Sequence, residues 1–293
     1  MDHSENGKPY AAFVGAVLIG GANFIAVSFS NQELPPFFGA ALRFALAALL
    51  FLAYARAMQI PLARGRAAAG AAVYGLLGVG LTYAGLYYAL VGLAAGTAAV
   101  IVAAAPLFTL GFAVLLGQER LSARGVVGGL LAMAGIAVLS WGTLVGASDW
   151  RYLAAALAGT AAASLSGVVA KALPDVHPVN MNAIGMAAGT VLLAAGSLAN
   201  GEPWVLPRAM PTTLAVGWLV VFGSVGLFQL VLYVIRRWTA SAAVYVTAGM
   251  PVVAVALGAL MLGQPVTWQM LVGGAIVIAA VYVGAISRAG GPE

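Results

Sequence analysis

Long apolar runs alternate with short segments of charge, proline and glycine along the whole chain. The runs hold about 20 residues, the length at which an α-helix crosses the hydrocarbon core of a bilayer. Short segments of alternating polarity, which are typical of transmembrane β-barrels, do not occur in the sequence. We therefore predict an all-α membrane protein with ten transmembrane helices. The predicted spans are residues 10–30, 37–55, 68–90, 95–116, 125–144, 152–172, 179–199, 211–235, 240–262 and 267–287.

The composition argues against several classes of protein. Hydrophobic residues make up 63% of the 293 positions and charged residues 7%, too few to cover a water-facing domain of this size. The sequence has no phosphate-binding loop, its basic residues are scattered, and His3 and His177 stand apart from any acidic cluster. We therefore expect a lipid bilayer around the protein, and no nucleotide, nucleic acid, metal, cofactor or enzymatic activity.

The basic residues divide unevenly between the two sides of the predicted membrane. An even number of spans places both termini on one side, and that side carries ten basic residues against two on the other. The ten are Lys8, Arg56, Arg64, Arg66, Arg120, Arg124, Lys171, Arg236, Arg237 and Arg288, and the two are Arg151 and Arg208. Because cytoplasmic loops carry the excess of Lys and Arg, we predict a multi-pass protein of a bacterial inner membrane with both termini in the cytoplasm.

The two halves of the chain repeat each other with an offset of 145 residues. The matched pairs are Gly78 with Gly223, Tyr88 with Tyr233, Ala98 with Ala243, Pro106 with Pro251, and Gly128-Gly129 with Gly273-Gly274. We predict one five-helix repeat in residues 1–148 and a second in residues 149–293. An odd number of spans inverts the second copy in the membrane, the arrangement of many alternating-access transporters. A duplicated membrane protein without a transport role is the alternative.

Several local motifs stand in a characteristic order. Span 2 follows Pro35-Pro36 and carries Arg43, and span 4 contains Pro106 and ends in the Leu-Gly-Gln-Glu run of residues 116–119. This order resembles the drug/metabolite transporter superfamily, and more closely the ten-helix EamA-type carriers, with similarity to the YddG-type exporters of aromatic and other neutral amino acids. The second half departs from the pattern, because Pro265 replaces the acid and Arg43 has no counterpart.

The resemblance implies a central cavity lined by the predicted spans 1, 3, 4, 6, 8 and 9. Several of these spans carry polar residues at helical spacing. Hydroxyls and amides beside aromatic rings suit a neutral or zwitterionic solute with an apolar side chain. Asn23 and Gln229 can instead bond between helices, which leaves a packing role open. The candidate substrate-binding residues are Asn23, Tyr83, Thr160, Ser164, Gln229 and Tyr245.

Four further residues are candidates for gating or coupling. Arg43 lies about 10 Å along span 2, where it serves either a structural ion pair or carbonyl contact, or a gating or carboxylate-facing role. Pro106 and Pro251 interrupt helix hydrogen bonding at equivalent places, as moving hinges or as static kinks. Glu119 closes span 4 and is either a proton-coupling group, as in family exporters, or a solvated charge near Arg120 and Arg124.

These observations favour a secondary transporter that exports or equilibrates amino acids or related small neutral metabolites, with aromatic or hydrophobic ones preferred. No carboxylate lies at membrane depth, so uniport or exchange is expected on the residues alone. A channel-like protein or a scaffold without alternating access is the alternative class.

The predicted orientation can be tested with reporter fusions. A reporter that is active only in the cytoplasm should work when fused after Glu293, because the ten-to-two division of basic residues places that end inside. A fusion at Asp149, on the opposite side, serves as the control. Activity of a periplasmic reporter at Glu293 would refute the orientation.

Overall fold

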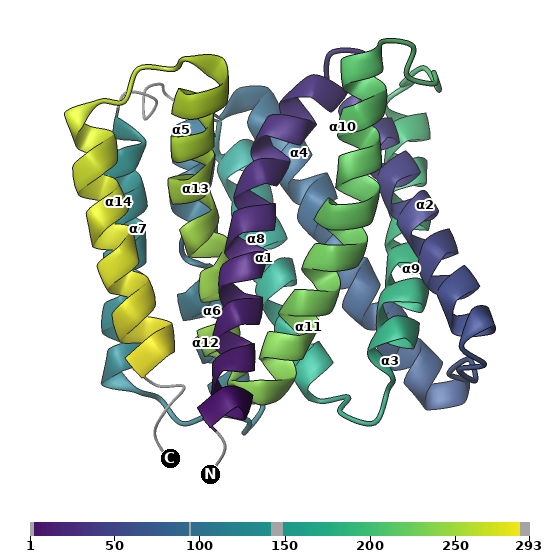
Figure 1. Ribbon diagram of the computed structural model, residues 1–293, viewed down its shortest axis with the longest axis horizontal. Coiled ribbons are helices and arrows are strands. Elements are labelled where there is room, and N and C mark those ends of the chain that lie inside the picture. Colours follow the sequence, from purple (N-terminus) through teal and green to yellow (C-terminus); the bar gives the residue numbers. More distant parts are fainter. Residues whose placement is uncertain (1–2, 94, 142–148, 288–293) are drawn as a thin grey trace.

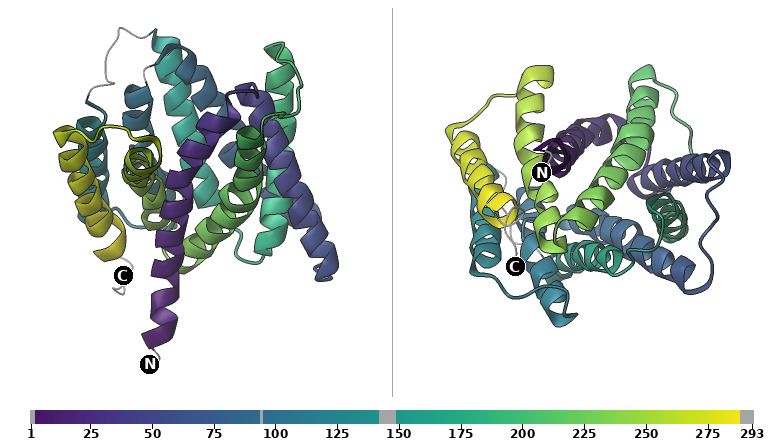
Figure 2. Two further views of the ribbon diagram at one scale, coloured as in Figure 1. Left: turned by 45° about the horizontal axis from the view of Figure 1, so that its top comes forward. Right: turned by 60° about the horizontal axis from the view of Figure 1, so that its bottom comes forward.

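The computed structural model describes residues 3–93, 95–141 and 149–287, and all regular elements in these ranges are helices. Both chain ends lie on the same face of the bundle (Figures 1 and 2). Among the described residues, nine helical stretches are long and apolar enough to cross a membrane, and the 17-residue helix Ala123–Leu139 is a shorter apolar one. The prediction of an all-α protein with ten membrane helices is confirmed.

The first half begins with two long helices and continues with a series of shorter ones. Its elements are α1 (His3–Ser30), α2 (Pro36–Ala57), α3 (Gly65–Gly75), the π-helix η1 (Leu76–Leu81), α4 (Thr82–Gly92), α5 (Ala95–Val102), α6 (Ala105–Leu115) and α7 (Ala123–Leu139). The second half follows the same plan. Its elements are α8 (Trp150–Lys171), α9 (Pro178–Ala199), α10 (Met210–Val220), η3 (Val221–Gly226), α11 (Leu227–Arg237), α12 (Ala240–Ala243), α13 (Tyr245–Leu262), α14 (Trp268–Val281) and η4 (Tyr282–Ile286).

The repeat seen in the sequence reappears in the helix boundaries. The series α3, η1 and α4 covers residues 65–92, and α10, η3 and α11 cover residues 210–237 with each boundary shifted by the same 145 residues. Figure 1 shows α3 starting at the face of the termini and α10 starting at the opposite face. The two series therefore run in opposite directions, as an inverted repeat requires.

Two predicted spans are interrupted rather than continuous. Span 4 breaks between α5 and α6, and Pro106 lies in the first turn of α6. The N–H groups of a first turn have no acceptor within the helix, so the N–H that proline lacks costs no hydrogen bond there. Span 9 breaks at Val244, before Pro251, which lies inside α13. The two prolines are therefore not equivalent in local structure, and their role as hinges stays a prediction. Span 5 is observed as α7, and its predicted end at 142–144 lies outside the described residues.

Small residues bring helices of the two halves into close contact. A Cβ atom on Gly75 would lie 1.8 Å from the carbonyl oxygen of Gly185, and one on Gly189 would lie 2.5 Å from Cβ of Val79. Gly185 and Gly189 lie four residues apart on α9, and both face the α3–η1 segment. Without a hydrophobic force between helices in lipid, this close approach supplies the van der Waals contact that holds them together.

Candidate functional site

A polar cluster lies where α1, α2 and η3 meet. The guanidinium of Arg43, whose side chain is 4% exposed, donates from Nε to Oγ of Ser224 (2.7 Å) and from Nη2 to the carbonyl oxygen of Gly223 (2.7 Å). The amide of Asn23 donates to the same carbonyl at 3.3 Å. One backbone oxygen of the second repeat thus binds two side chains of the first.

The π-helix explains why this carbonyl is free. In an α-helix the N–H of Leu227 would bond to Gly223, but here it donates to the carbonyls of Phe222 and Ser224 instead. A carbonyl without a helical partner in hydrocarbon must find another donor. Arg43 and Asn23 supply these donors, so the π-turn and the two side chains form one structural unit.

The remaining polar atom of Asn23 is also bonded. Its Oδ1 accepts from Nε1 of Trp218 at 3.2 Å, and a Cβ on Gly223 would come within 2.5 Å of this oxygen. Asn23 was predicted as a cavity residue with a cross-helix bond as the alternative, and the structure shows the cross-helix bonds. A substrate contact at Asn23 stays a prediction.

Aromatic rings surround the Arg43 guanidinium. Its Cζ lies 4.8 Å from the ring centroid of Phe44 and 6.0 Å from that of Tyr83, within cation–π range. Phe44 also packs edge-on against Tyr83 (5.0 Å) and Phe228 (5.8 Å), and Tyr83 against Tyr87 (5.9 Å). Tyr83, a predicted binding residue, is therefore half-buried beside the one arginine that lies at membrane depth in the described chain.

Gln229 belongs to a second polar chain. Its Oε1 accepts from Nδ2 of Asn182 at 3.2 Å, and Oδ1 of Asn182 accepts from the hydroxyl of Tyr74 at 3.3 Å. Asn182 is fully buried on α9. This helix forms the seventh predicted span, which was not expected to line the cavity, so Asn182 was not among the predicted residues. The signal was available, because a buried asparagine in an apolar run has to be satisfied by another helix.

The other predicted binding residues lie within helix contacts. Thr160 donates to the carbonyl of Ala156 in its own helix, and Ser164 donates to Ala105 on α6. Tyr245 is 1% exposed and its hydroxyl donates to the carbonyl of Gly125 at 3.2 Å. Helix packing accounts for all three hydroxyls in this conformation, and their contact with substrate stays a prediction.

Glu119 is buried rather than solvated. Its side chain is 9% exposed, Oε1 accepts from the backbone N–H of Ser241 at 3.0 Å, and Oε2 is bonded to the Ser241 hydroxyl. The alternative that Glu119 is a solvated charge near Arg120 and Arg124 is therefore wrong. Glu119 is buried by a tertiary contact, because the segment after α6 folds against the start of α12. The sequence pattern does not show this contact.

Further bonds join the same elements on the face of the termini. The ammonium of Lys171 donates to the carbonyls of Ile235 (2.9 Å) and Trp238 (2.7 Å) at the end of α11. Gln118 donates to the carbonyl of Val168 at 3.1 Å. We call Gln118, Glu119, Lys171 and Ser241 the inner latch, because they tie α6 and α8 to α11 and α12.

Three of the four residues of the inner latch have no matching polar residue in the repeat. With the 145-residue offset, Ala26 corresponds to Lys171 and Gly96 to Ser241. Pro265 stands where the second copy would carry the acid of Glu119. Apart from Gln118, which corresponds to Gln264, the side chains of the inner latch are therefore not repeated in the sequence.

A different pair of acids joins the loops of the opposite face. Glu202 accepts from the N–H groups of Phe37 (3.2 Å) and Phe38 (2.7 Å) at the start of α2, and Glu33 accepts from those of Arg208 and Ala209. The backbone hydrogen bonds from Ala209 and Arg208 lower the pKa of Glu33. Its contribution to stability is therefore present above its ordinary pKa and is lost as the pH falls through the lowered value.

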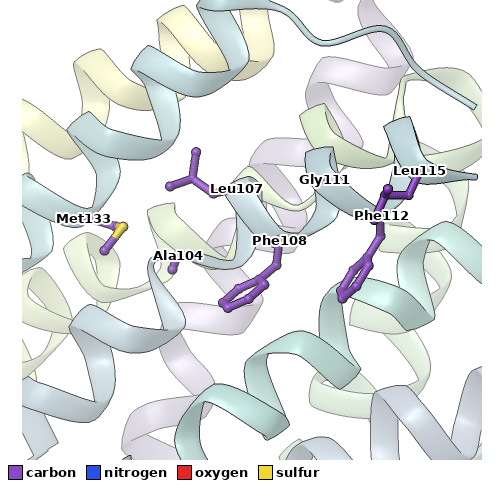
Figure 3. A pocket seen from close by; sticks show the side chains of 7 residues that line it. All are labelled: Ala104, Leu107, Phe108, Gly111, Phe112, Leu115 and Met133. Carbon is purple, nitrogen blue, oxygen red and sulfur yellow. The ribbon is translucent and has the colours of Figure 1, made fainter.

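An apolar groove runs along α6 beside α7 (Figure 3) and has a volume of about 450 Å³. It is lined by Ala104, Leu107, Phe108, Gly111, Phe112, Leu115 and Met133. None of the predicted binding residues lies in it, and its lining offers no polar side chain to orient a solute. The groove is therefore separate from the polar clusters described above.

These features define a duplicated, inverted membrane bundle with polar clusters between its halves, the architecture of secondary carriers. The model of the EamA-like transporter family matches the chain twice, over residues 7–141 and 150–285. The chain therefore belongs to the EamA-like transporter family, in the drug/metabolite transporter superfamily, as its resemblance implied.

Similar proteins carry transporter names. The uncharacterized inner membrane transporter YedA of Escherichia coli strain K12 is 31% identical over 289 residues, covering 94% of this chain and 90% of its own. A probable amino-acid metabolite efflux pump of Salmonella typhimurium is 25% identical over 295 residues, with 91% of each chain covered. A crystal structure with 22% identity superimposes with a TM-score of 0.83 over 98% of each chain, which confirms the fold. The protein is thus a multi-pass membrane transporter by family.

The inner latch can be tested by cysteine accessibility, since the chain has no native cysteine. Val168 is fully buried with Ala113 and Ala240, where α6, α8 and α12 meet. In a Val168→Cys protein, Glu119→Gln should raise the rate of labelling by a water-soluble maleimide about tenfold or more, because hydrogen bonds to a charged group are weakened.

Glu33→Gln in the same Val168→Cys background is the matched control, since it removes an acid from the opposite face and should leave the rate unchanged. An unchanged labelling rate in monodisperse Glu119→Gln protein would show that Glu119 does not hold this face closed.

Proposed function

We propose that the protein is a secondary transporter that moves amino acids or related small neutral metabolites out of the cytoplasm by alternating access. The observation that carries this proposal is the inverted repeat, in which α3–η1–α4 and α10–η3–α11 have the same internal boundaries and run in opposite directions. Two such halves can exchange conformations, which converts an inward-open state into an outward-open one.

The halves are taken as residues 1–148 and 149–293, with both termini in the cytoplasm. In this orientation the inner latch lies on the cytoplasmic face, and the described conformation is the one closed toward the cytoplasm. Transport then requires that Glu119 and Lys171 release α12 and α11. The latch therefore acts as the cytoplasmic gate.

The substrate class follows from the polarity of the buried clusters. Amide groups at Asn23 and Gln229 and the rings around Tyr83 suit a small solute with polar and apolar parts. The name of the Salmonella relative, an amino-acid metabolite efflux pump, agrees with this class at 25% identity. Aromatic or hydrophobic neutral amino acids are the first solutes to test.

The energy source follows from the position of the acids. No Asp or Glu lies within the mid-membrane clusters of the described residues, so movement down the solute's own gradient is the expected mode. Glu119 is the one residue for which proton coupling is proposed as an alternative, because its carboxylate is buried. Protonation of Glu119 would weaken its bonds to Ser241 and open the latch, which would couple proton entry to gating.

Counterflow in proteoliposomes tests transport and the drive together. Liposomes preloaded with unlabelled phenylalanine should accumulate labelled phenylalanine transiently without a pH difference, because a carrier exchanges solute through alternating states. A channel-like protein would give flux without this transient.

A matched measurement with an imposed pH difference separates uniport from proton coupling. If liposomes concentrate substrate only with the pH difference, and Glu119→Gln removes that concentration but keeps counterflow, the uniport mode is wrong and Glu119 is the coupling residue. Lack of counterflow for the whole amino-acid series in correctly folded protein would contradict the proposed function.

A further inference from the structure

Arg43 carries a charge that no described residue neutralises. Its side chain is 4% exposed, and its described partners are a hydroxyl and a carbonyl, both uncharged. No carboxylate among the described residues lies within ion-pair distance of the guanidinium. A buried cation in a membrane protein normally pairs with an anion or faces a functional pathway, because desolvation of an uncompensated charge is costly.

The acid at the entrance of the same helix is already engaged. The two carboxylate oxygens of Glu202 accept hydrogen bonds from the N–H groups of Phe37 and Phe38. Arg43 lies five residues beyond Phe38, about 7 Å farther along the helix axis. Glu202 therefore caps α2 and leaves the arginine without a carboxylate partner. Among the described residues no other carboxylate takes its place, so a ligand is the candidate source of the anion.

The guanidinium also keeps donors for a ligand. It has five N–H groups, and the described bonds from Nε and Nη2 engage two of them. These two bonds to the η3 segment fix the plane of the group, and a planar guanidinium of fixed orientation matches a carboxylate well. The guanidinium lies next to Phe44 and Tyr83, which offer apolar surface beside the charge.

We infer that Arg43 binds the carboxylate of the transported solute, while the rings of Phe44, Tyr83, Tyr87 and Phe228 receive its apolar side chain. This inference rests on the proposed transport function and narrows its substrate class. Of the described carboxylates, Glu202 lies near Tyr87, but both of its oxygens already accept backbone N–H groups at the start of α2. The solute is therefore recognised by its carboxylate, and an α-amino group is not required.

A series of four probes with the same ring tests this specificity in the wild-type protein. L-phenylalanine and 3-phenylpropionate carry the carboxylate, whereas phenylalaninamide and phenethylamine do not. The first two should compete for counterflow of labelled phenylalanine, and the last two should compete roughly tenfold or more weakly, because a charge-assisted bidentate pair is lost.

Intrinsic fluorescence gives a readout that does not depend on turnover. Trp218 bonds to Asn23, which shares the Gly223 carbonyl with Arg43, so a ligand at Arg43 should alter Trp218 emission. Trp218→Phe should remove that response and leave the order of competition intact. In wild type the two carboxylates should give the fluorescence change at lower concentration than the amide and the amine.

Variants of Arg43 test the assignment itself. Arg43→Gln should abolish the preference for carboxylates over the amide, and Arg43→Lys should retain part of it because the charge remains without the planar donors. Arg56→Gln is the matched control, since Arg56 lies exposed at the end of the same helix. If Arg43→Gln does not yield monodisperse protein, the Arg43→Lys variant and the wild-type probe series test whether Arg43 binds the carboxylate.

The outcomes separate the inference from the function on which it rests. Equal competition by phenylalanine and its amide, or an unchanged preference in Arg43→Lys and Arg43→Gln, would overturn the role of Arg43 while counterflow upholds transport. Failure of all four probes to bind or to be transported would contradict both.

Discussion

A backbone carbonyl in hydrocarbon needs a hydrogen-bond donor, and this requirement governs the centre of the molecule. The π-turn in η3 removes the helical donor from Gly223, and Arg43 and Asn23 of the other repeat replace it. The equivalent turn in η1 shifts its bonds in the same way, because the N–H of Thr82 donates to Leu77 and Val79 and passes over Gly78. Both halves thus contain a helix with a built-in irregularity at membrane depth.

The two irregular turns are satisfied differently, which makes the symmetric fold functionally asymmetric. Around η3 the partners include a charged side chain, whereas around η1 the hydroxyl of Ser166 donates to Tyr74 and that of Thr82 to Leu77. The same asymmetry appears at the surface, where the inner latch occupies one face alone. In the proposed mechanism, duplication supplies two exchangeable halves, and the residues that differ between them supply a binding group and a gate.

The sequence predicted the architecture well because the main signals are local. Span length, flanking charge and the 145-residue offset identify the helices, their number and their repetition without any knowledge of contacts. The break in span 4 was missed, since Pro106 reads equally well as a kink and as the first turn of a new helix. The π-turns were missed as well, because no residue type requires them.

The site was predicted less completely because it depends on contacts between distant segments. Asn23, Arg43 and Gln229 were recognised as polar groups at depth, but their partners Ser224, Trp218 and Asn182 were not. Glu119 was placed correctly at the end of span 4, yet its burial against Ser241 depends on a segment 122 residues away. The helical periodicity of a sequence shows which residues share one face of a helix. It does not show which other helix packs against that face.

The central claim is that the two halves open and close opposite faces in turn. Spin labels on cysteines at Leu116 and Arg237 report on the latched face. Labels at Met261, the repeat equivalent of Leu116, and at Val91, next to the repeat equivalent of Arg237, report on the other face. All four side chains are exposed. In liposomes, a transported solute should lengthen the distance across the latched face and shorten the other in the same population of molecules. Unchanged distances, or two distances that change in the same direction while transport proceeds, would contradict alternating access.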